Sequence, residues 1–282
     1  MFVNMVLLAF KLVAGIVGRS SAMVADAVHS ASDFATDIVV LAFVKLSSKP
    51  KDAGHKYGHG KYETVASIVI ALALGAVGVG ICINGAEKIA AVVRGEQIAR
   101  PEFVALVAAV VSIATKEWLY RYTVKVGQKA ESSAVVANAW HHRSDALSSI
   151  GTLIGIGCAY TLGGKWVIAD PIAAIVVAAM ILKVAIDLLR KGFDELVDGS
   201  LPAELEEEIV RIITEDAAIS QPHNLRTRRI GSNIAIEVHI RVDGDMSVRE
   251  SHALTESIER RLREKFGEGT FVSIHVEPVK LV

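Results

Sequence analysis

The sequence predicts an α-helical membrane domain with six transmembrane helices, followed by a small cytoplasmic α+β domain of ferredoxin-like topology. Hydrophobic residues make up 52% of the 282 residues and the mean hydropathy is +0.42, which is too apolar for an ordinary soluble domain. The apolar residues are concentrated before about residue 187, whereas charged residues are dense from Pro202 onward. We therefore expect a membrane domain over residues 1–190, a linker over 191–201 and a soluble domain over 202–282.

Six apolar segments form the predicted membrane domain. The third is the clearest, because its twenty residues carry no charge and are long enough to cross a bilayer. The fourth is short, and the fifth is free of charge only in its second half. A buried helical bundle in a soluble protein is the alternative, but the third segment and the abundance of Gly and Ala favour a membrane. The segments are Phe2–Val17, Ala22–Leu46, Thr64–Ile83, Phe103–Thr115 continuing to Trp118, Ser132–Leu162 and Trp166–Leu182.

The lysines and arginines of the loops predict the orientation in the membrane. The connections after the second, fourth and sixth segments are rich in these residues, which favours the cytoplasmic side. Both termini are therefore expected in the cytoplasm, in a prokaryote-like plasma membrane. The first segment lacks the basic start and the cleavage site of a signal peptide, so we expect a membrane helix that begins abruptly. The residues counted are Lys45, Lys49, Lys51, Lys56, Lys61, Lys116, Arg121, Lys125, Lys129, Lys183, Arg190 and Lys191.

The last 80 residues or so show the alternation expected of a small α/β unit. A helical pattern follows Pro202, and two strand-like runs separated by Gly231-Ser232 suggest a hairpin. An amphipathic helix and a final strand complete the order α-β-β-α-β. The predicted elements are Ala203–Glu215, Leu225–Ile230, Asn233–Val242, Val248–Phe266 and Phe271–Val276.

Net charge and cysteine usage exclude several classes of partner and site. The formal net charge is −1, so no overall positive field points to nucleic acid as a partner. Cys82 and Cys158 each lie in an apolar run, where small buried hydrophobic residues are expected. Neither a disulfide nor a CxxC metal site is supported.

The second apolar segment carries a polar stripe. At 100° per residue, Asp26, His29, Asp33 and Asp37 lie within an arc of about 80° on an otherwise apolar helix. His29 and Asp33 are one helical turn apart, so both can reach one small ion. Charged residues inside a membrane are costly and usually functional.

The stripe recurs in the fifth segment. The sequence SSAMVADAVHSASD, beginning at Ser20, aligns without gaps to SSAVVANAWHHRSD, beginning at Ser132, with nine of fourteen positions identical. His141 and Asp145 therefore correspond to His29 and Asp33, and Asn138 corresponds to Asp26. The loop charges give the two segments opposite directions, which suggests an inverted repeat of three helices each. His142 points about 100° away from His141 and is expected to be a neighbour rather than a ligand.

Two HxxxD pairs on two facing helices supply two imidazoles and two carboxylates. This set suits a tetrahedral ion such as Zn²⁺, and two carboxylates with neutral histidines balance the charge of a divalent cation. Because the ligands must be deprotonated to bind metal, protons and metal compete for the site. A structural polar network that joins the two helices is the alternative. The predicted ligands are His29, Asp33, His141 and Asp145.

The remaining histidines form two further candidate clusters. Asp52, His55 and His59 lie in the glycine-rich loop KPKDAGHKYGHGKYE, for which a solvated basic loop is the alternative. In the soluble domain, one histidine precedes the predicted strands, one lies in a strand, one on the amphipathic helix and one on the last strand, two residues before a glutamate. These residues are His223, His239, His252, His275 and Glu277.

At these motifs the chain resembles the cation diffusion facilitator family of divalent metal exporters. The resemblance covers nearly the whole chain and rests on ADAVHSASD, HKYGHGK, HHRSD, LRTRRIG and SIHVEP. It implies a homodimer of six-helix subunits with a cytoplasmic metallochaperone-like domain, which exports metal from the cytoplasm against proton entry. It also implies that a site with two histidines and two aspartates favours Zn²⁺ or Cd²⁺, whereas replacement of histidine by aspartate favours iron or manganese.

The resemblance assigns a role to each candidate cluster. It implies a transport site at His29 and Asp33 with His141 and Asp145, a loop site at Asp52 with its two histidines, and a binuclear tail site in the soluble domain. Lys61 and Asp198 match a pair that joins the membrane and tail domains in the family. Zinc in the tail would favour the closed dimer and so report the cytoplasmic metal level.

Two other functions remain open from the sequence. One is a membrane-anchored metal sensor or scaffold that transports nothing and recruits partners through its tail. The other is a metal-dependent membrane enzyme, which is disfavoured because no motif such as HExxH places a general base beside an open metal position. We therefore expect no enzymatic activity, and efflux of Fe²⁺ or Mn²⁺ is the alternative to zinc.

Overall fold

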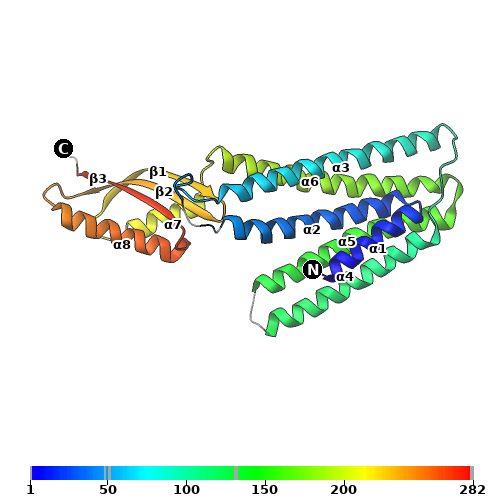
Figure 1. The fold of residues 1–282 in the computed structure, drawn as a ribbon, viewed down its shortest axis with the longest axis horizontal. Coiled ribbons are helices and arrows are strands. Elements are labelled where there is room, and N and C mark those ends of the chain that lie inside the picture. The colour runs from blue at the N-terminus through cyan, green and yellow to red at the C-terminus, as the bar shows by residue number, and fades with distance from the viewer. Residues whose placement is uncertain (1, 48, 50–51, 130–132, 280–282) are drawn as a thin grey trace. The chain divides into compact units, whose positions relative to one another are not determined.

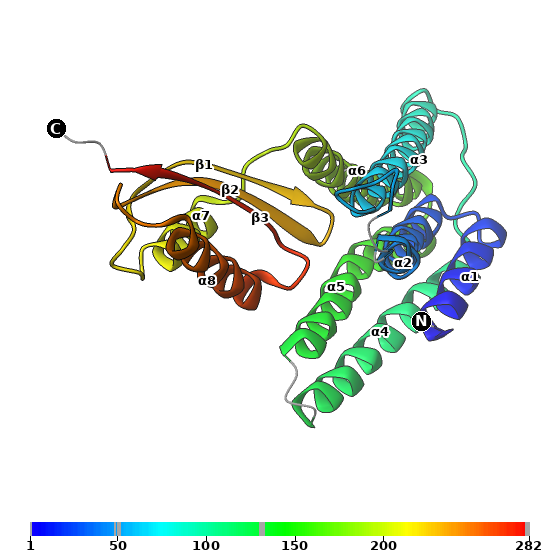
Figure 2. The ribbon, with the colours of Figure 1, turned by 60° about the vertical axis from the view of Figure 1, so that its left-hand side comes forward.

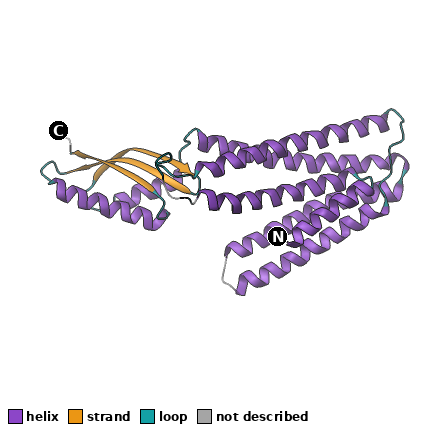
Figure 3. Ribbon diagram, in the orientation of Figure 1, coloured by secondary structure: helices purple, strands orange, loops and turns teal. Residues whose placement is uncertain are grey.

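The computed structural model describes residues 2–47, 49, 52–129 and 133–279, and for residues 2, 36–47, 127, 133–144, 147 and 148 it describes the backbone alone. Helices make up the first two thirds of the chain, and the strands are confined to the C-terminal part (Figures 1 and 3). The elements are α1 (Phe2–Val17), α2 (Ser21–Ser47), α3 (Lys61–Val93), α4 (Phe103–Lys129), α5 (Ser133–Leu162), the short 3₁₀ helix η1 (Gly164–Ile168), α6 (Ala169–Leu196), α7 (Ala203–Ile213), β1 (Ser220–Ile230), β2 (Asn233–Val242), α8 (Val248–Phe266) and β3 (Phe271–Pro278).

Three helical stretches are long and apolar enough to cross a membrane by length and composition, within the residues that the structure describes. They are Lys61–Val93, Phe103–Val126 and Gly164–Leu196, and Val3–Val17 and Ser149–Leu162 are shorter apolar helices. All six predicted apolar segments are helical over their described residues, but six membrane spans are not established by this measure. The chain is nonetheless a membrane protein by its long apolar helices.

The chain divides into two compact units. One contains residues 1–38 and 69–187, and the other contains residues 39–68 and 188–282. The loop after α2 and the first turns of α3 therefore belong to the same unit as the C-terminal domain. The range 191–201, which the sequence predicts as a linker, begins inside α6, because this helix continues to Leu196.

Small residues allow the helices of the first unit to pack closely. Figures 1 and 2 both show α4 and α5 side by side. The core of these helices is built from alanines with few large side chains, as is common where membrane helices approach each other. Gly155 on α5 faces Ala173 on α6 so closely that a Cβ atom at Gly155 would clash. The buried core residues are Ala14, Ala22, Met23, Ala105, Ala108, Ala109 and Ile156.

The start of α2 is held by a carboxylate from α6. Asp170 accepts hydrogen bonds from the Ser20 hydroxyl at 2.5 Å and from the Ser21 backbone N–H at 2.7 Å. The Ser20 hydroxyl also accepts a bond from the Met23 backbone N–H at 3.0 Å, as an N-cap residue does. These bonds satisfy backbone donors that a helix start leaves unpaired, and they place the α2 polar stripe relative to α6.

The second unit contains a three-stranded mixed sheet in the order β1-β2-β3. β1 and β2 are antiparallel and joined at Gly231-Ser232, and β2 and β3 are parallel because α8 connects them. Figure 2 shows α7 and α8 on one side of this sheet. Ile209, Ile236, Ile258 and Leu262 form part of the core between these layers. The element order agrees with the predicted α-β-β-α-β.

β1 begins at Ser220, five residues before the predicted start at Leu225. Pro222 cannot donate a backbone hydrogen bond, and Gln221 and Asn224 have positive φ angles of 46° and 50°. The register shifts on both sides of His223, yet His223 still pairs with His239 across the strands. The irregular start of β1 thus brings two histidines together, which residue periodicity could not predict.

Candidate metal centres

Three predicted ligands of the membrane domain converge. His29 and Asp33 lie one turn apart on α2, and Asp145 lies on α5; one ligand atom from each falls within 4.8 Å of the others. His29 and Asp145 are buried, at 7% and 8% exposure. The Nδ1 atom of His29 is buried and accepts or donates no hydrogen bond within the described part of the chain. An imidazole nitrogen and two carboxylates around one point form a donor set for a divalent cation.

His141 lies on α5, one turn before Asp145. Its side chain is outside the described residues, as are those of Asn138 and Asp37. The structure therefore brings together three of the four predicted transport ligands, and the fourth stays a prediction.

Lys116 lies beside this cluster. The sequence pattern places it among the loop charges after the fourth segment, but in the structure it lies inside α4 and is buried. Its Nζ atom is 3.4 Å from Oδ2 of Asp145. An ammonium group therefore contacts one of the predicted metal ligands, and the charge of the cluster differs from that of the four ligands alone.

Asp26 forms a second buried ion pair, with Lys11. Its Oδ2 atom is 2.7 Å from Nζ of Lys11 on α1, and both side chains are at most 1% exposed. The Ser149 hydroxyl donates to Asp26 at 2.9 Å, and Lys11 donates to the Ser30 hydroxyl at 3.1 Å. The polar stripe of α2 thus has two parts. His29 and Asp33 are metal-type ligands, whereas Asp26 connects α2 to α1 through its ion pair and to α5 through its hydrogen bond.

The three predicted residues of the loop cluster lie close together in the structure. Oδ1 of Asp52 is 3.3 Å from Nδ1 of His55, and Oδ2 is 3.3 Å from Nε2 of His59. Asp52 also accepts hydrogen bonds from the backbone N–H groups of Gly54 and His55. The His55 backbone bond is the largest cause that lowers the pKa of Asp52, so this carboxylate is ionised and available to a cation. Asp52 and His55 are exposed, whereas His59 is buried.

Lys61, at the start of α3, contacts Asp198. Its Nζ atom donates to Oδ1 of Asp198 at 2.8 Å. This hydrogen bond is the main reason that the pKa of Asp198 lies below its ordinary value. Asp198 has a φ angle of 59°, which few residues other than glycine adopt, so the contact requires a particular backbone turn after α6.

Two histidines and a glutamate converge on the sheet of the second unit. Nδ1 of His239 is 3.0 Å and Nε2 of His223 is 3.3 Å from the Glu277 carboxylate. The hydrogen bond with His239 is the largest cause that lowers the pKa of Glu277. Arg241 also lies 3.6 Å from Glu277 and supplies a competing positive charge. The three convergent donors nevertheless fit a metal ion of the zinc type.

The other two predicted tail ligands lie differently. His275 is adjacent to this group, with its ring 4.6 Å from that of His239 and its Nε2 atom 3.9 Å from Glu277. His252 is on α8, 70% exposed, and contacts Glu256 at 3.4 Å. The structure therefore does not bring His252 to the other tail histidines within one subunit.

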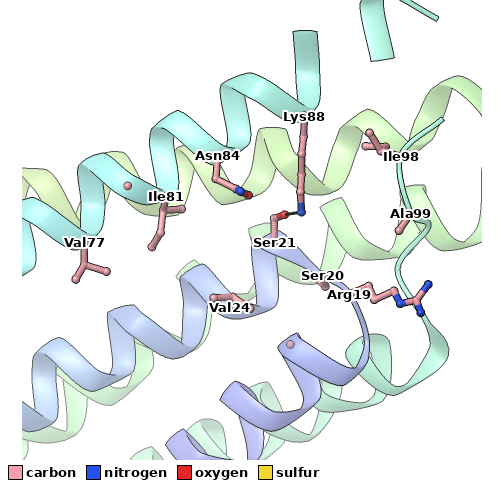
Figure 4. Close-up of a pocket in the computed structure, with 12 residues that line it drawn as sticks. Arg19, Ser20, Ser21, Val24, Val77, Ile81, Asn84, Lys88, Ile98 and Ala99 are labelled. Carbon is pink, nitrogen blue, oxygen red and sulfur yellow. Dashed lines mark hydrogen bonds between the residues drawn. The ribbon is translucent and has the colours of Figure 1, made fainter. Parts of the chain in front are cut away.

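A cavity of about 700 Å³ lies among α1, α2 and α3 and the segment after α3. Figure 4 shows Lys88 reaching across it from α3 to Ser21 on α2, with a hydrogen bond of 2.6 Å. The described residues that line it include no predicted ligand, so this cavity is distinct from the three clusters.

Comparisons with known proteins agree over the whole chain. Residues 1–197 match the cation efflux transmembrane domain, and residues 201–279 match the cation efflux protein cytoplasmic domain. The chain is 34% identical over 279 residues to the manganese efflux system protein MneP of Bacillus subtilis, covering 98% of this chain and 92% of that protein. It is 32% identical to the magnetosome protein MamB of Magnetospira sp., covering 99% and 93%.

Among solved structures, the C-terminal part is similar to the metal-bound C-terminal domain of the CzcD transporter from Thermotoga maritima. The identity is 35%, with 28% of this chain and 92% of that chain covered, and the TM-score is 0.26. Both matched family models describe cation efflux proteins, and together they account for nearly every residue. The chain therefore belongs to the cation diffusion facilitator family, whose members carry divalent metal cations out across membranes.

Proposed function

We propose that this protein exports a divalent metal ion from the cytoplasm in exchange for protons, with Zn²⁺ as the main substrate and Cd²⁺ as a second. The observation that carries the proposal is the convergence of His29, Asp33 and Asp145 from two helices within 4.8 Å. His141, one turn from Asp145, would complete a four-coordinate set. A site with all its ligands from the protein suits a carrier, since no position stays open for a reacting water.

The transport cycle follows from this donor set. Metal enters from the cytoplasm between α2 and α5, binds deprotonated ligands, and leaves on the other side when protons return to them. The helices alternate between inward-open and outward-open states around a fixed site. Histidine in two of four positions favours a borderline ion such as Zn²⁺ over ions that prefer oxygen ligands alone.

Manganese is the second candidate substrate. It is favoured by one observation, namely that MneP, a manganese efflux system protein, is 34% identical over nearly the whole chain. Carboxylates suit Mn²⁺ better than imidazoles do. Coordination by the imidazole of His141 would therefore favour Zn²⁺ over Mn²⁺. Fe²⁺ is an alternative of the same kind.

We place the protein in the plasma membrane as a homodimer, with six transmembrane helices in residues 1–190, a linker over 191–201 and the domain 202–282 in the cytoplasm with both termini. The loop cluster at Asp52 and the tail cluster at Glu277 would hold regulatory zinc. Metal there would favour the closed dimer when cytoplasmic metal is high. A metal sensor that transports nothing is the competing function.

The test is transport into sealed vesicles that contain the full chain and a metal-sensitive dye. Zn²⁺, Cd²⁺, Mn²⁺ and Fe²⁺ are compared with and without a pH gradient. Asp33→Asn and Asp145→Asn should abolish uptake, whereas Asp187→Asn, an exposed aspartate on α6, should leave it unchanged. His29→Asp should shift preference toward Mn²⁺. Metal binding without uptake by the unaltered protein would establish the sensor and refute the exporter.

A further inference from the structure

Lys116 places a positive charge at the predicted transport site. The residue lies near the middle of α4, is 5% exposed, and has its Nζ atom 3.4 Å from Oδ2 of Asp145. Within the described residues, this nitrogen makes no hydrogen bond that meets normal geometry. Lys116 thus rests against Asp145 through charge rather than through a directed bond.

The ion pair of Lys11, the other buried lysine of this unit, provides a comparison. Lys11 approaches Asp26 to 2.7 Å and also donates to the Ser30 hydroxyl. The partner, Asp26, is not part of the group formed by His29, Asp33 and Asp145. Lys116 differs on each point: its contact is longer, it lacks the additional hydrogen bond, and its partner is a predicted metal ligand.

Electrostatic repulsion opposes the Lys116 contact once metal is bound at Asp145. When Asp33 and Asp145 are both deprotonated and hold no metal, they place two negative charges in a poorly solvated site, and the ammonium offsets one of them. A divalent cation bound at Asp145 would lie within a few ångströms of the ammonium and repel it strongly where water is scarce. The flexible four-carbon stem of Lys116 allows the ammonium to withdraw.

We propose that the Lys116 ammonium is an internal competitor of the transported metal: it occupies Asp145 when the site is empty and must leave when metal binds. This inference rests on the proposed transport function and adds to it a residue that sets the affinity of the site. It lowers the affinity for metal, which helps release, and it offsets the charge of Asp145 whenever the metal-free site is deprotonated.

The test measures metal binding to the full-length protein in detergent, by competition with a fluorescent zinc chelator at fixed pH. Asp52→Asn and Glu277→Gln are included in every variant, so that binding at the loop and tail clusters is weakened. Lys116→Gln should bind Zn²⁺ tighter by on the order of tenfold to a hundredfold, the range by which a close charge alters the ion affinity of a carboxylate.

Matched variants separate competition from structure. Lys116→Arg keeps the charge and should retain the original affinity within a few fold. Lys125→Gln removes the same charge from an exposed position on the same helix and should change nothing. In an Asp145→Asn background, Lys116→Gln should no longer tighten binding, because the carboxylate for which the two cations compete is absent.

The direction of the change is decisive, since loss of a merely structural contact would weaken binding. Unchanged or weaker binding in Lys116→Gln, with Asp33→Asn still abolishing binding, would overturn this inference and leave the proposed function intact. Lys116→Met serves as the second variant if Lys116→Gln does not fold. In vesicles, the competitor also predicts that Lys116→Gln lowers both KM and kcat, because metal leaves a tighter site more slowly.

Discussion

Removal of Lys11 should destabilise the helical unit by a large and measurable amount. Lys11 is 0% exposed and Asp26 is 1% exposed, with 2.7 Å between their charged atoms. After Lys11→Met, the Asp26 carboxylate would remain buried and would still accept the hydrogen bond from the Ser149 hydroxyl, but its positively charged partner would be gone. Breaking a buried pair by removing one partner costs about 3–5 kcal/mol, because the other charge stays without compensation.

The measurement is thermal unfolding of the full chain in detergent micelles. Tryptophan fluorescence reports the helices, because Trp118, Trp140 and Trp166 all lie before the C-terminal domain. The loss corresponds to a decrease in Tm of roughly 10 °C for a unit of this size. The combined change of Lys11→Met with Asp26→Asn removes both charges and should recover most of the stability. A loss below about 1 kcal/mol, or a double variant no more stable than the single one, would refute the reasoning.

Three further predictions concern packing, capping and pH. Gly155→Ala should destabilise the helical unit by about 1–3 kcal/mol because its Cβ would clash with α6, whereas Gly151→Ala, which has open space, should not; Tm measures both. Ser247→Ala breaks the capping box of α8 and should cost about 1 kcal/mol in urea unfolding, and Ser247→Asp should retain most of it. The pKa of Glu277 is lowered from its ordinary 4.5, so its stabilising effect is present above that value and is lost as the pH falls through the lowered pKa. Glu277→Gln should therefore weaken the metal-free protein at about pH 7, and this loss should shrink steadily as the pH is lowered through the lowered pKa; a loss that is independent of pH would contradict this.

The site motifs could be read from the sequence because they depend on local spacing. His29 and Asp33 are one turn apart on any helix, and the repeat at Ser132 identified the helix that carries the matching pair. The structure brings Asp145 to the two α2 residues, as the repeat predicted. The Asp52 loop cluster also formed, because its three residues lie within eight positions of one another and are joined by a turn.

Other features depended on contacts that spacing does not encode. The start of β1 was predicted too late, because bulges and positive φ angles around His223 break the alternating pattern of a strand. His252 contacts Glu256 on its own helix, so its place among the tail ligands stays a prediction. Lys116 was counted as a loop charge because the fourth apolar segment is interrupted there, although α4 continues to Lys129.

The sequence by itself determined the division into apolar helices and a charged α-β-β-α-β domain, the family, and the HxxxD ligand pairs, because each is a pattern along one element or one stretch of chain. The tertiary structure alone decided which charge faces which. Lys11 on α1 pairs with Asp26, and Lys116 on α4 pairs with Asp145. The sequence contains all four residues but does not indicate these pairings. The reason is physical: a buried charge requires a partner within a few ångströms, and only the packing and rotation of separate helices determine which side chains come that close.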